Sequence, residues 1–115
     1  MVYLFLADGF EETEALCPYD LLLRAGVDIK TVSVNGDKAV TGTHGIKVFA
    51  DFTLNEIEAE CDGVILPGGM PGASNLDANK RVDEILSKAY SEGKIIGAIC
   101  AAPFILGKRN MLSGL

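Results

Sequence analysis

Several features that mark large classes of proteins are missing from this sequence of 115 residues. No apolar run is long enough to span a bilayer. The N-terminal residues lack the positive charge that begins a signal peptide. There is no internal repeat, linker or low-complexity tract, and the length suits one small domain. We therefore expect a single domain that works in the cytoplasm and does not bind membranes.

Basic residues are also few. Ten Lys and Arg stand against sixteen Asp and Glu, which gives a formal net charge of -6 at pH 7. The basic residues form no cluster, so the sequence argues against binding to nucleic acid or to anionic lipid. Hydrophobic residues make up 49% of the chain, which is enough to build a globular core.

Cysteine and histidine are scarce as well. The three cysteines are an odd number without the spacing of a metal site, and the single histidine, His44, leaves no zinc set. We expect no metal and no cofactor. This cysteine content favours a reducing compartment, where disulfides do not form.

What the chain does have is a regular alternation of strand-like and helix-like segments. Short apolar runs predict buried strands, and apolar residues at helical spacing predict helices. The expected strands are residues 2–7, 27–34, 63–66 and 94–99, the expected helices are 11–25, 54–59 and 78–91, and residues 40–50 resemble a hairpin. This alternation indicates an α/β fold in which helices cover both faces of a mainly parallel sheet.

Ligand sites in such sheets lie at the carboxyl ends of the strands. One of these ends carries Cys100, which follows an apolar strand and precedes the small residues Ala101 and Ala102. This is the pattern of a nucleophile elbow, in which a sharp turn between strand and helix presents the reactive atom. A helix that begins at Ala101 would direct its amides at the sulfur and favour the thiolate. The alternative is a buried structural cysteine.

A glycine-rich loop, Pro67 to Gly72, lies at the same edge of the sheet. It matches neither the Walker loop nor the dinucleotide fingerprint, so phosphate binding is only weakly supported. Gly68 and Gly69 can instead present backbone N–H groups to a developing oxyanion. The alternative is an ordinary tight turn.

Acidic residues begin the first predicted helix, also at this edge. Glu11, Glu12 and Glu14 suit the positive end of the helix dipole. Glu14 points a different way from the other two, so it is the candidate to hold or pass a proton beside Cys100.

The remaining candidate groups have simpler interpretations. His44, beside Gly45, is expected at an exposed loop tip, with a catalytic role as the less favoured alternative. Cys17 and Cys61 are expected to be structural.

Three motifs, in this order, resemble the ThiJ/PfpI superfamily. They are Ala7-Asp8-Gly9-Phe10-Glu11-Glu12-Thr13-Glu14-Ala15, Leu66-Pro67-Gly68-Gly69 and Ala98-Ile99-Cys100-Ala101-Ala102-Pro103. The likeness extends along the whole chain and is strongest to the branch of the parkinsonism-associated deglycase. The resemblance implies a flavodoxin-like three-layer sandwich and a homodimer.

The resemblance also implies roles for five residues. Cys100 would be the oxidation-prone nucleophile, and Glu14 a buried, protonated acid that donates a hydrogen bond to the thiolate. Gly68, Gly69 and the backbone of Ala101 would form the oxyanion-binding turn.

The implied function is a cysteine-dependent glyoxalase or deglycase that acts on small reactive carbonyls of the methylglyoxal type, with a role in redox stress. Two alternatives remain open. One is an oxidative-stress sensor or chaperone without turnover. The other is a PfpI-like cysteine peptidase or amidase, which would need a histidine base close to the cysteine.

The sequence departs from the family pattern in two places. Thr43-His44 stands where close relatives carry Ser-Arg, and the chain stops at Leu115 where family members continue. The histidine that relatives place near the cysteine falls in that later part. We expect residues 1–115 to be a single domain that is incomplete at its C-terminus. The rest would be a separate C-terminal polypeptide, from cleavage or a split, or would lie outside this sequence.

Overall fold

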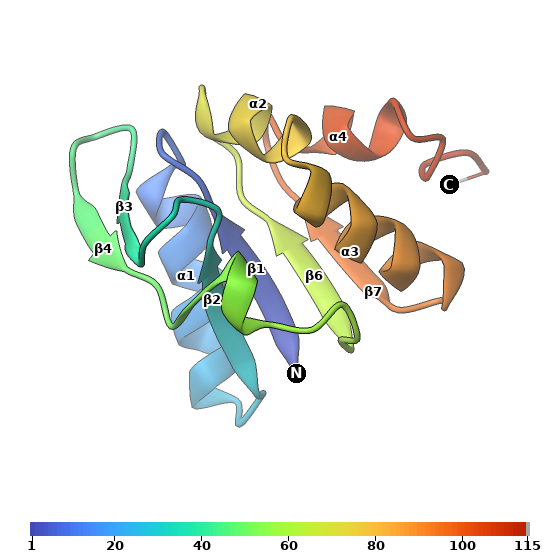
Figure 1. The fold of residues 1–115 in the computed structure, drawn as a ribbon, viewed down its shortest axis with the longest axis horizontal. Helices are drawn as coiled ribbons and strands as arrows, with labels where there is room; N and C mark the ends of the chain where they lie inside the picture. Colours follow the sequence, from blue (N-terminus) through green and yellow to red (C-terminus); the bar gives the residue numbers. More distant parts are fainter. Residues whose placement is uncertain (115) are drawn as a thin grey trace.

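The computed structural model describes residues 1–114, and its centre is a five-stranded sheet in which every pairing is parallel. The strand order is β5-β2-β1-β6-β7 (Figure 1). The strands are β1 (Val2–Leu6), β2 (Ile29–Ser33), β5 (Phe52–Thr53), β6 (Gly63–Leu66) and β7 (Ile95–Ala98), and a separate antiparallel hairpin joins β3 (Ala39–Thr41) to β4 (Lys47–Phe49). The sequence-based prediction of a mainly parallel sheet is confirmed.

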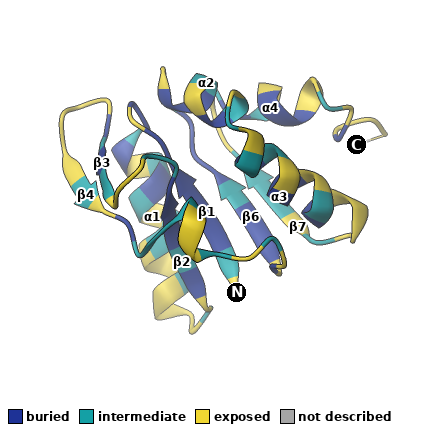
Figure 2. Ribbon diagram, viewed as in Figure 1, coloured by how far each residue is buried: buried dark blue, intermediate teal, exposed yellow. Residues whose placement is uncertain are grey.

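Helices cover both faces of this sheet. On one face lies α1 (Glu12–Arg24), and on the other lie α2 (Gly72–Asp77), α3 (Lys80–Ser91) and α4 (Pro103–Gly107). Alternate residues of β1 serve the two layers, because side chains in a strand alternate between faces. Leu4 and Leu6 pack with α1, whereas Tyr3 and Phe5 pack on the side of α3. Figure 2 shows buried residues concentrated on the central strands. The three-layer arrangement is therefore as expected.

The two long helices begin at side-chain caps. Glu11 accepts a hydrogen bond from the backbone N–H of Glu14 at the start of α1, over 2.8 Å. Asn79 caps α3 in the same way, by accepting from the N–H groups of Arg81 and Val82. Such caps satisfy amides that have no partner within the helix. The bounds of α1 and α3 fall within one or two residues of the predicted ones.

The structure corrects the prediction in four places. Helix α2 and the short strand β5 were not expected, and residues 54–59 form only a 3₁₀ turn, η1 (Leu54–Glu56). Helix α2 follows a run of Pro and Gly that is typical of a turn, and its burial of Ala73 and Leu76 stabilises it. Helix α4 begins at Pro103 rather than at Ala101, because Cys100, Ala101 and Ala102 form the turn itself.

No helix in residues 1–114 combines the length and the apolar character needed to cross a bilayer.

The turn at Cys100 has an unusual backbone. Cys100 has φ 58°, in the left-handed region that residues other than glycine rarely adopt. Two backbone hydrogen bonds flank it, from Ile99 N–H to the Leu66 carbonyl (3.3 Å) and from Ala102 N–H to the Ile99 carbonyl (3.0 Å). They hold the turn against β6, and an imposed left-handed residue between strand and helix is the mark of a nucleophile elbow.

A paired substitution tests this backbone strain. The free energy of unfolding of Cys100→Gly should be about 1 kcal/mol higher than that of Cys100→Ala, so the glycine variant should be the more stable one. The left-handed backbone costs an L-residue roughly 1–2 kcal/mol, partly offset by the freedom of glycine in the unfolded chain. Urea denaturation measures the difference. At Cys17, inside α1, the order should reverse by about 1 kcal/mol, since glycine disfavours helix. The same order at both positions would contradict the strained turn.

A second set of contacts fastens the segment after α4 to α2 and α3. Arg109 donates to Asp77 through Nη1 and to Asp83 through Nε, both over 2.7 Å, and Lys108 donates to Asp77 over 2.8 Å. The side chains of Arg109 and Asp77 are only 16% and 14% exposed. Burial opposes the charge of Asp77, but hydrogen bonds from Lys108 and Arg109 outweigh it and lower the pKa of Asp77.

This lowered pKa predicts a dependence of stability on pH. The Asp77 contribution should be complete above its ordinary pKa of 3.8 and should be lost as the pH falls through the lower folded value. Arg109→Met should cost about 1–3 kcal/mol at neutral pH, because it removes hydrogen bonds to buried charge. This loss of stability should become smaller in acid, because protonation of Asp77 removes the charge that Arg109 stabilises. Arg24→Met, which breaks an exposed pair with Asp20, should cost less than about 1 kcal/mol. Equal losses in the two variants at neutral pH would contradict this assignment.

Candidate active site

The candidate residues come from the carboxyl ends of three adjacent strands. Glu14 lies in the first turn of α1 after β1, Gly68 and Gly69 follow β6, and Cys100 follows β7. Since β1, β6 and β7 are neighbours in the sheet, their following loops meet at one edge. The structure therefore brings together residues that are far apart in the sequence.

Gly68 lies between Glu14 and Cys100. Its N–H donates to Glu14 Oε1 over 3.1 Å. A Cβ atom at Gly68 would lie 3.0 Å from Cys100 Cβ and 2.9 Å from the Ile99 carbonyl oxygen, and it would overlap Glu14 Oε1. Only a residue without a side chain fits between the acid and the cysteine. The hydrogen bond also orients Glu14, whose side chain is partly buried.

The loop after β6 also packs on the loop after β1. Glu11 N–H donates to the Gly68 carbonyl over 2.9 Å. A Cβ atom at Gly69, where φ is +92°, would lie 2.5 Å from Glu11 N and 2.7 Å from the Gly9 carbonyl oxygen. These backbone contacts hold the two loops as one unit.

The amides of this edge differ in what they bind. The Gly68 N–H is engaged with Glu14 rather than left for an oxyanion, which departs from the role expected of it. Among residues 1–114, the N–H groups of Gly69 and Ala101 donate to no other protein group. These two amides can donate hydrogen bonds to an oxyanion and so stabilise a developing negative charge.

The three cysteines have different environments. Cys100 and Cys17 are exposed, whereas Cys61 is buried. Burial of Cys61 raises the pKa of its thiol, which fits the structural role expected of it. The prediction of a structural role does not fit Cys17, because its side chain is exposed and not part of the core. It faces an apolar hollow of about 450 Å³ that is also lined by Glu14 and Ile99.

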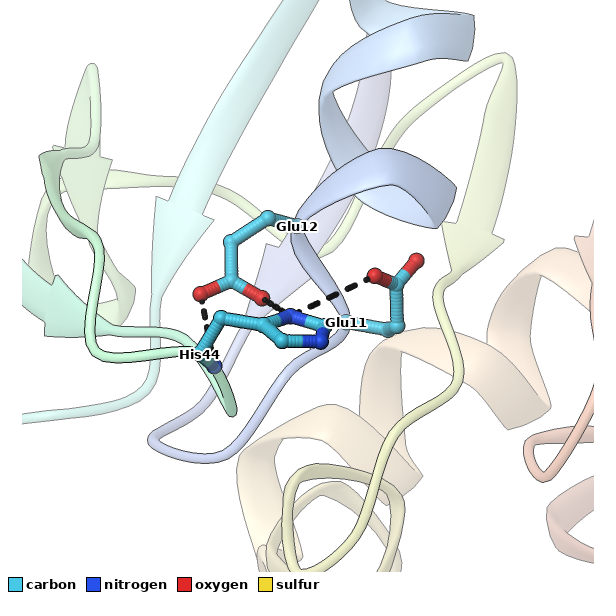
Figure 3. A group of neighbouring side chains, drawn as sticks. All are labelled: Glu11, Glu12 and His44. Carbon is cyan, nitrogen blue, oxygen red and sulfur yellow. Dashed lines mark hydrogen bonds and ion pairs between the residues drawn. The ribbon is translucent and has the colours of Figure 1, made fainter.

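His44 lies in the loop between β3 and β4, and its side chain is 66% exposed, as expected. Its pairing was not predicted. The ring Nδ1 lies 2.7 Å from Glu12 Oε1, and the backbone N–H of His44 donates to Glu12 Oε2 over 2.9 Å (Figure 3). No local pattern signals this contact, since it joins residues 32 positions apart.

The pairing shifts both pKa values. The hydrogen bond to Glu12 and its negative charge raise the pKa of His44. For Glu12, burial favours the neutral acid, but hydrogen bonds from the His44 ring and from backbone N–H groups outweigh burial and lower the pKa of Glu12 to about 2. Glu12 is therefore a carboxylate at neutral pH.

Known proteins resemble this chain in sequence. The family pattern described as the DJ-1/PfpI family matches residues 1–115. Protein dj-1beta of Drosophila melanogaster is 36% identical over 110 residues, covering 95% of this chain and 59% of that protein. Deglycase PfpI of Pyrococcus furiosus is 35% identical over 116 residues, covering 99% of this chain and 69% of that protein.

Solved structures show the same relationship. A structure described as Toxoplasma gondii DJ-1, oxidized, superimposes with a TM-score of 0.94 at 35% identity, covering 98% of this chain and 62% of that one. Schizosaccharomyces pombe DJ-1 superimposes with a TM-score of 0.87 at 30% identity, covering 97% of this chain and 64% of that one. The fold is thus the flavodoxin-like fold of these proteins. The chain spans about three fifths of the Drosophila and Toxoplasma relatives. Since the family pattern spans the full sequence and the fold agrees, this chain belongs to the DJ-1/PfpI family.

Proposed function

We propose that this chain carries the catalytic cysteine and acid of a glyoxalase or deglycase that acts on small α-oxoaldehydes such as methylglyoxal. The observation that carries the proposal is the junction at Gly68, whose N–H donates to Glu14 and which leaves no room for a Cβ atom beside Cys100. A nucleophile and a proton-transferring acid side by side are what this reaction needs. Two relatives bear the name deglycase, which supports the same class of reaction.

The first step is covalent addition. The Cys100 thiolate attacks the aldehyde carbon, the C=O π bond breaks, and its electron pair moves onto oxygen to give a hemithioacetal alkoxide. The N–H groups of Gly69 and Ala101 would stabilise that alkoxide until it takes up a proton.

The second step is proton transfer by Glu14. Once Glu14 has protonated the alkoxide, its carboxylate, with Oε1 held by the Gly68 N–H, would remove the proton from the carbon bound to sulfur through Oε2. The electron pair of that C–H bond forms an enediolate, and Glu14 then protonates the neighbouring carbon while the first hydroxyl proton passes to the second oxygen. The resulting thioester reacts with water, which releases the 2-hydroxy acid and restores the thiolate. The reaction is an internal oxidation and reduction of the substrate plus one water, so it needs no cofactor. The same addition would act on the carbonyl adducts of early glycated thiols and amines.

The proposal includes the partners that the family resemblance implies, namely a second copy of the chain and a separate C-terminal segment. Large apolar side chains stay exposed on α1 and near β7, and they are the surface that such a partner would cover: Leu21, Leu23, Ile95 and Ile99.

Substitution of the two reactive residues tests the enzyme. Cys100→Ser and Glu14→Gln should each lower the rate of lactate formation from methylglyoxal by at least about 100-fold, because each removes a group that forms or breaks a bond. Cys17→Ser is the matched control, since that thiol is exposed near the same edge yet takes no part, and its rate should stay unchanged. Full activity in either active-site variant would overturn the proposal.

A second candidate function is a sensor of oxidants. Cys100 is exposed on a strained turn, and the N–H groups of Gly69 and Ala101 would stabilise a sulfinate formed there. One structural relative is described as oxidized. The peptidase alternative gains no support, because among residues 1–114 the His44 ring pairs with Glu12 and Glu11 and makes no hydrogen bond to Cys100.

Graded peroxide distinguishes the sensor from an ordinary exposed thiol. Cys100 should gain two oxygen atoms before Cys17 or Cys61 gains any, as measured by intact mass and peptide mapping. In Glu14→Gln the order should persist with slower formation of the sulfinate, since this change alters the hydrogen bond from Glu14 to the Cys100 sulfur that the family resemblance implies. Earlier oxidation of Cys17, which is also exposed, would exclude the sensor.

A further inference from the structure

Beside the cysteine site, three side chains from two segments converge on one point. Glu11 and Glu12 begin α1, and His44 comes from the loop between β3 and β4 (Figure 3). One ligand atom from each, the His44 ring nitrogen and two carboxylate oxygens, lies within 4.8 Å of the others. Imidazole nitrogen and carboxylate oxygen are the ligands that zinc and similar ions take in proteins.

Each carboxylate is held by its second oxygen, so the first is free to turn to the ring. Glu12 Oε2 accepts from the N–H groups of His44 (2.9 Å) and Ile46 (3.3 Å). Glu11 Oε2 accepts from the N–H of Glu14 over 2.8 Å. The Oε1 atoms of Glu12 and Glu11 then lie 2.7 Å and 3.7 Å from His44 Nδ1. The backbone thus positions both oxygens.

The cluster is negatively charged and open on one side. The Glu12 side chain is 6% exposed and that of Glu11 is 23% exposed, whereas the His44 ring is 66% exposed. A Cβ atom at Gly42 would overlap the Glu12 carboxylate, so the hairpin backbone closes the inner side. A hydrated cation can approach from the ring side and keep water in its remaining positions.

We propose that Glu11, Glu12 and His44 bind a divalent transition-metal ion of the zinc class, through His44 Nδ1 and one oxygen of each carboxylate. Ligand atoms about 2.0–2.2 Å from a tetrahedral ion lie roughly 3.4 Å apart. The 2.7 Å and 3.7 Å separations bracket that value, and the two carboxylate oxygens lie within 4.8 Å of each other, so binding needs shifts of the exposed ring and of the carboxylates. The ring binds in its neutral form, and its Nδ1 hydrogen bond to Glu12 is exchanged for the metal. The two carboxylates balance the charge of the ion.

This metal site is independent of the proposed reaction, although it shares a loop with it. Glu11 supplies a ligand through its side chain, and its backbone N–H donates to the carbonyl of Gly68. The ion would therefore brace the loop that carries Glu14. We expected no metal because the sequence has a single histidine. That reasoning left out the carboxylates of Glu11 and Glu12, which the fold brings close to His44.

Zinc titration tests the site, with the exposed thiols removed because thiolates also bind zinc. In the full chain carrying Cys17→Ser and Cys100→Ser, calorimetry with zinc chloride should show one site. In that background, Glu11→Gln and His44→Gln should each weaken binding at least about tenfold, the lower range of losses around metal sites. Both replacements are conservative, since a glutamine oxygen can still cap α1 and a glutamine amide can still donate to Glu12.

Two controls separate ligation from charge and from folding. Glu58→Gln removes one negative charge at an exposed position and should leave the affinity unchanged. Zinc should raise the melting temperature of the background protein but not of the two ligand variants, because only native-state binding stabilises. Cobalt should give d–d absorption without a thiolate charge-transfer band. Absence of zinc binding in the background without exposed thiols, or an affinity unchanged by Glu11→Gln and His44→Gln, would overturn the proposal.

Discussion

The approach of two loops at a residue without a side chain is the constraint on which the candidate active site depends. Gly68 has room for no Cβ atom, because Glu14, the Ile99 carbonyl and Cys100 already surround it. Its N–H positions one oxygen of Glu14, and its carbonyl receives the N–H of Glu11. A single glycine therefore sets the distance between the strand end that carries the cysteine and the helix start that carries the acid.

The start of α1 shows how one helical turn can serve different purposes. Glu11 caps the helix, Glu12 turns to the hairpin and is buried against His44, and Glu14 turns to Gly68. The three acids differ in direction because successive residues of a helix are rotated by about 100°. Their environments differ accordingly, from the largely enclosed Glu12 carboxylate to the partly buried Glu14. Charge is concentrated at the edge of the sheet where the helix dipole favours it.

Strain and rigidity occur together at this edge. Cys100 has a left-handed backbone, and it is flanked by hydrogen bonds that join it to the end of β6 and close the turn. Beyond it, Arg109 links the segment after α4 to Asp77 and Asp83. A strained residue persists only where its surroundings hold it. The parallel sheet and the ion pairs that join the segment after α4 to α2 and α3 supply that support.

The sequence alone determined most of the helices and strands, and it determined that the loops after the parallel strands lie at one edge of the sheet. The strands other than β5 and the helices α1 and α3 were predictable because periodicity and capping residues are local signals. Cys100 was predictable as an elbow because small residues follow a strand, and Glu14 and Gly68 because loops after parallel strands converge. Helix α2, the exposure of Cys17 and the contact of His44 with Glu12 were decided only by the tertiary structure. Packing stabilises a helix where Pro and Gly favour a turn, and long-range contacts between loops leave no periodic pattern in the chain.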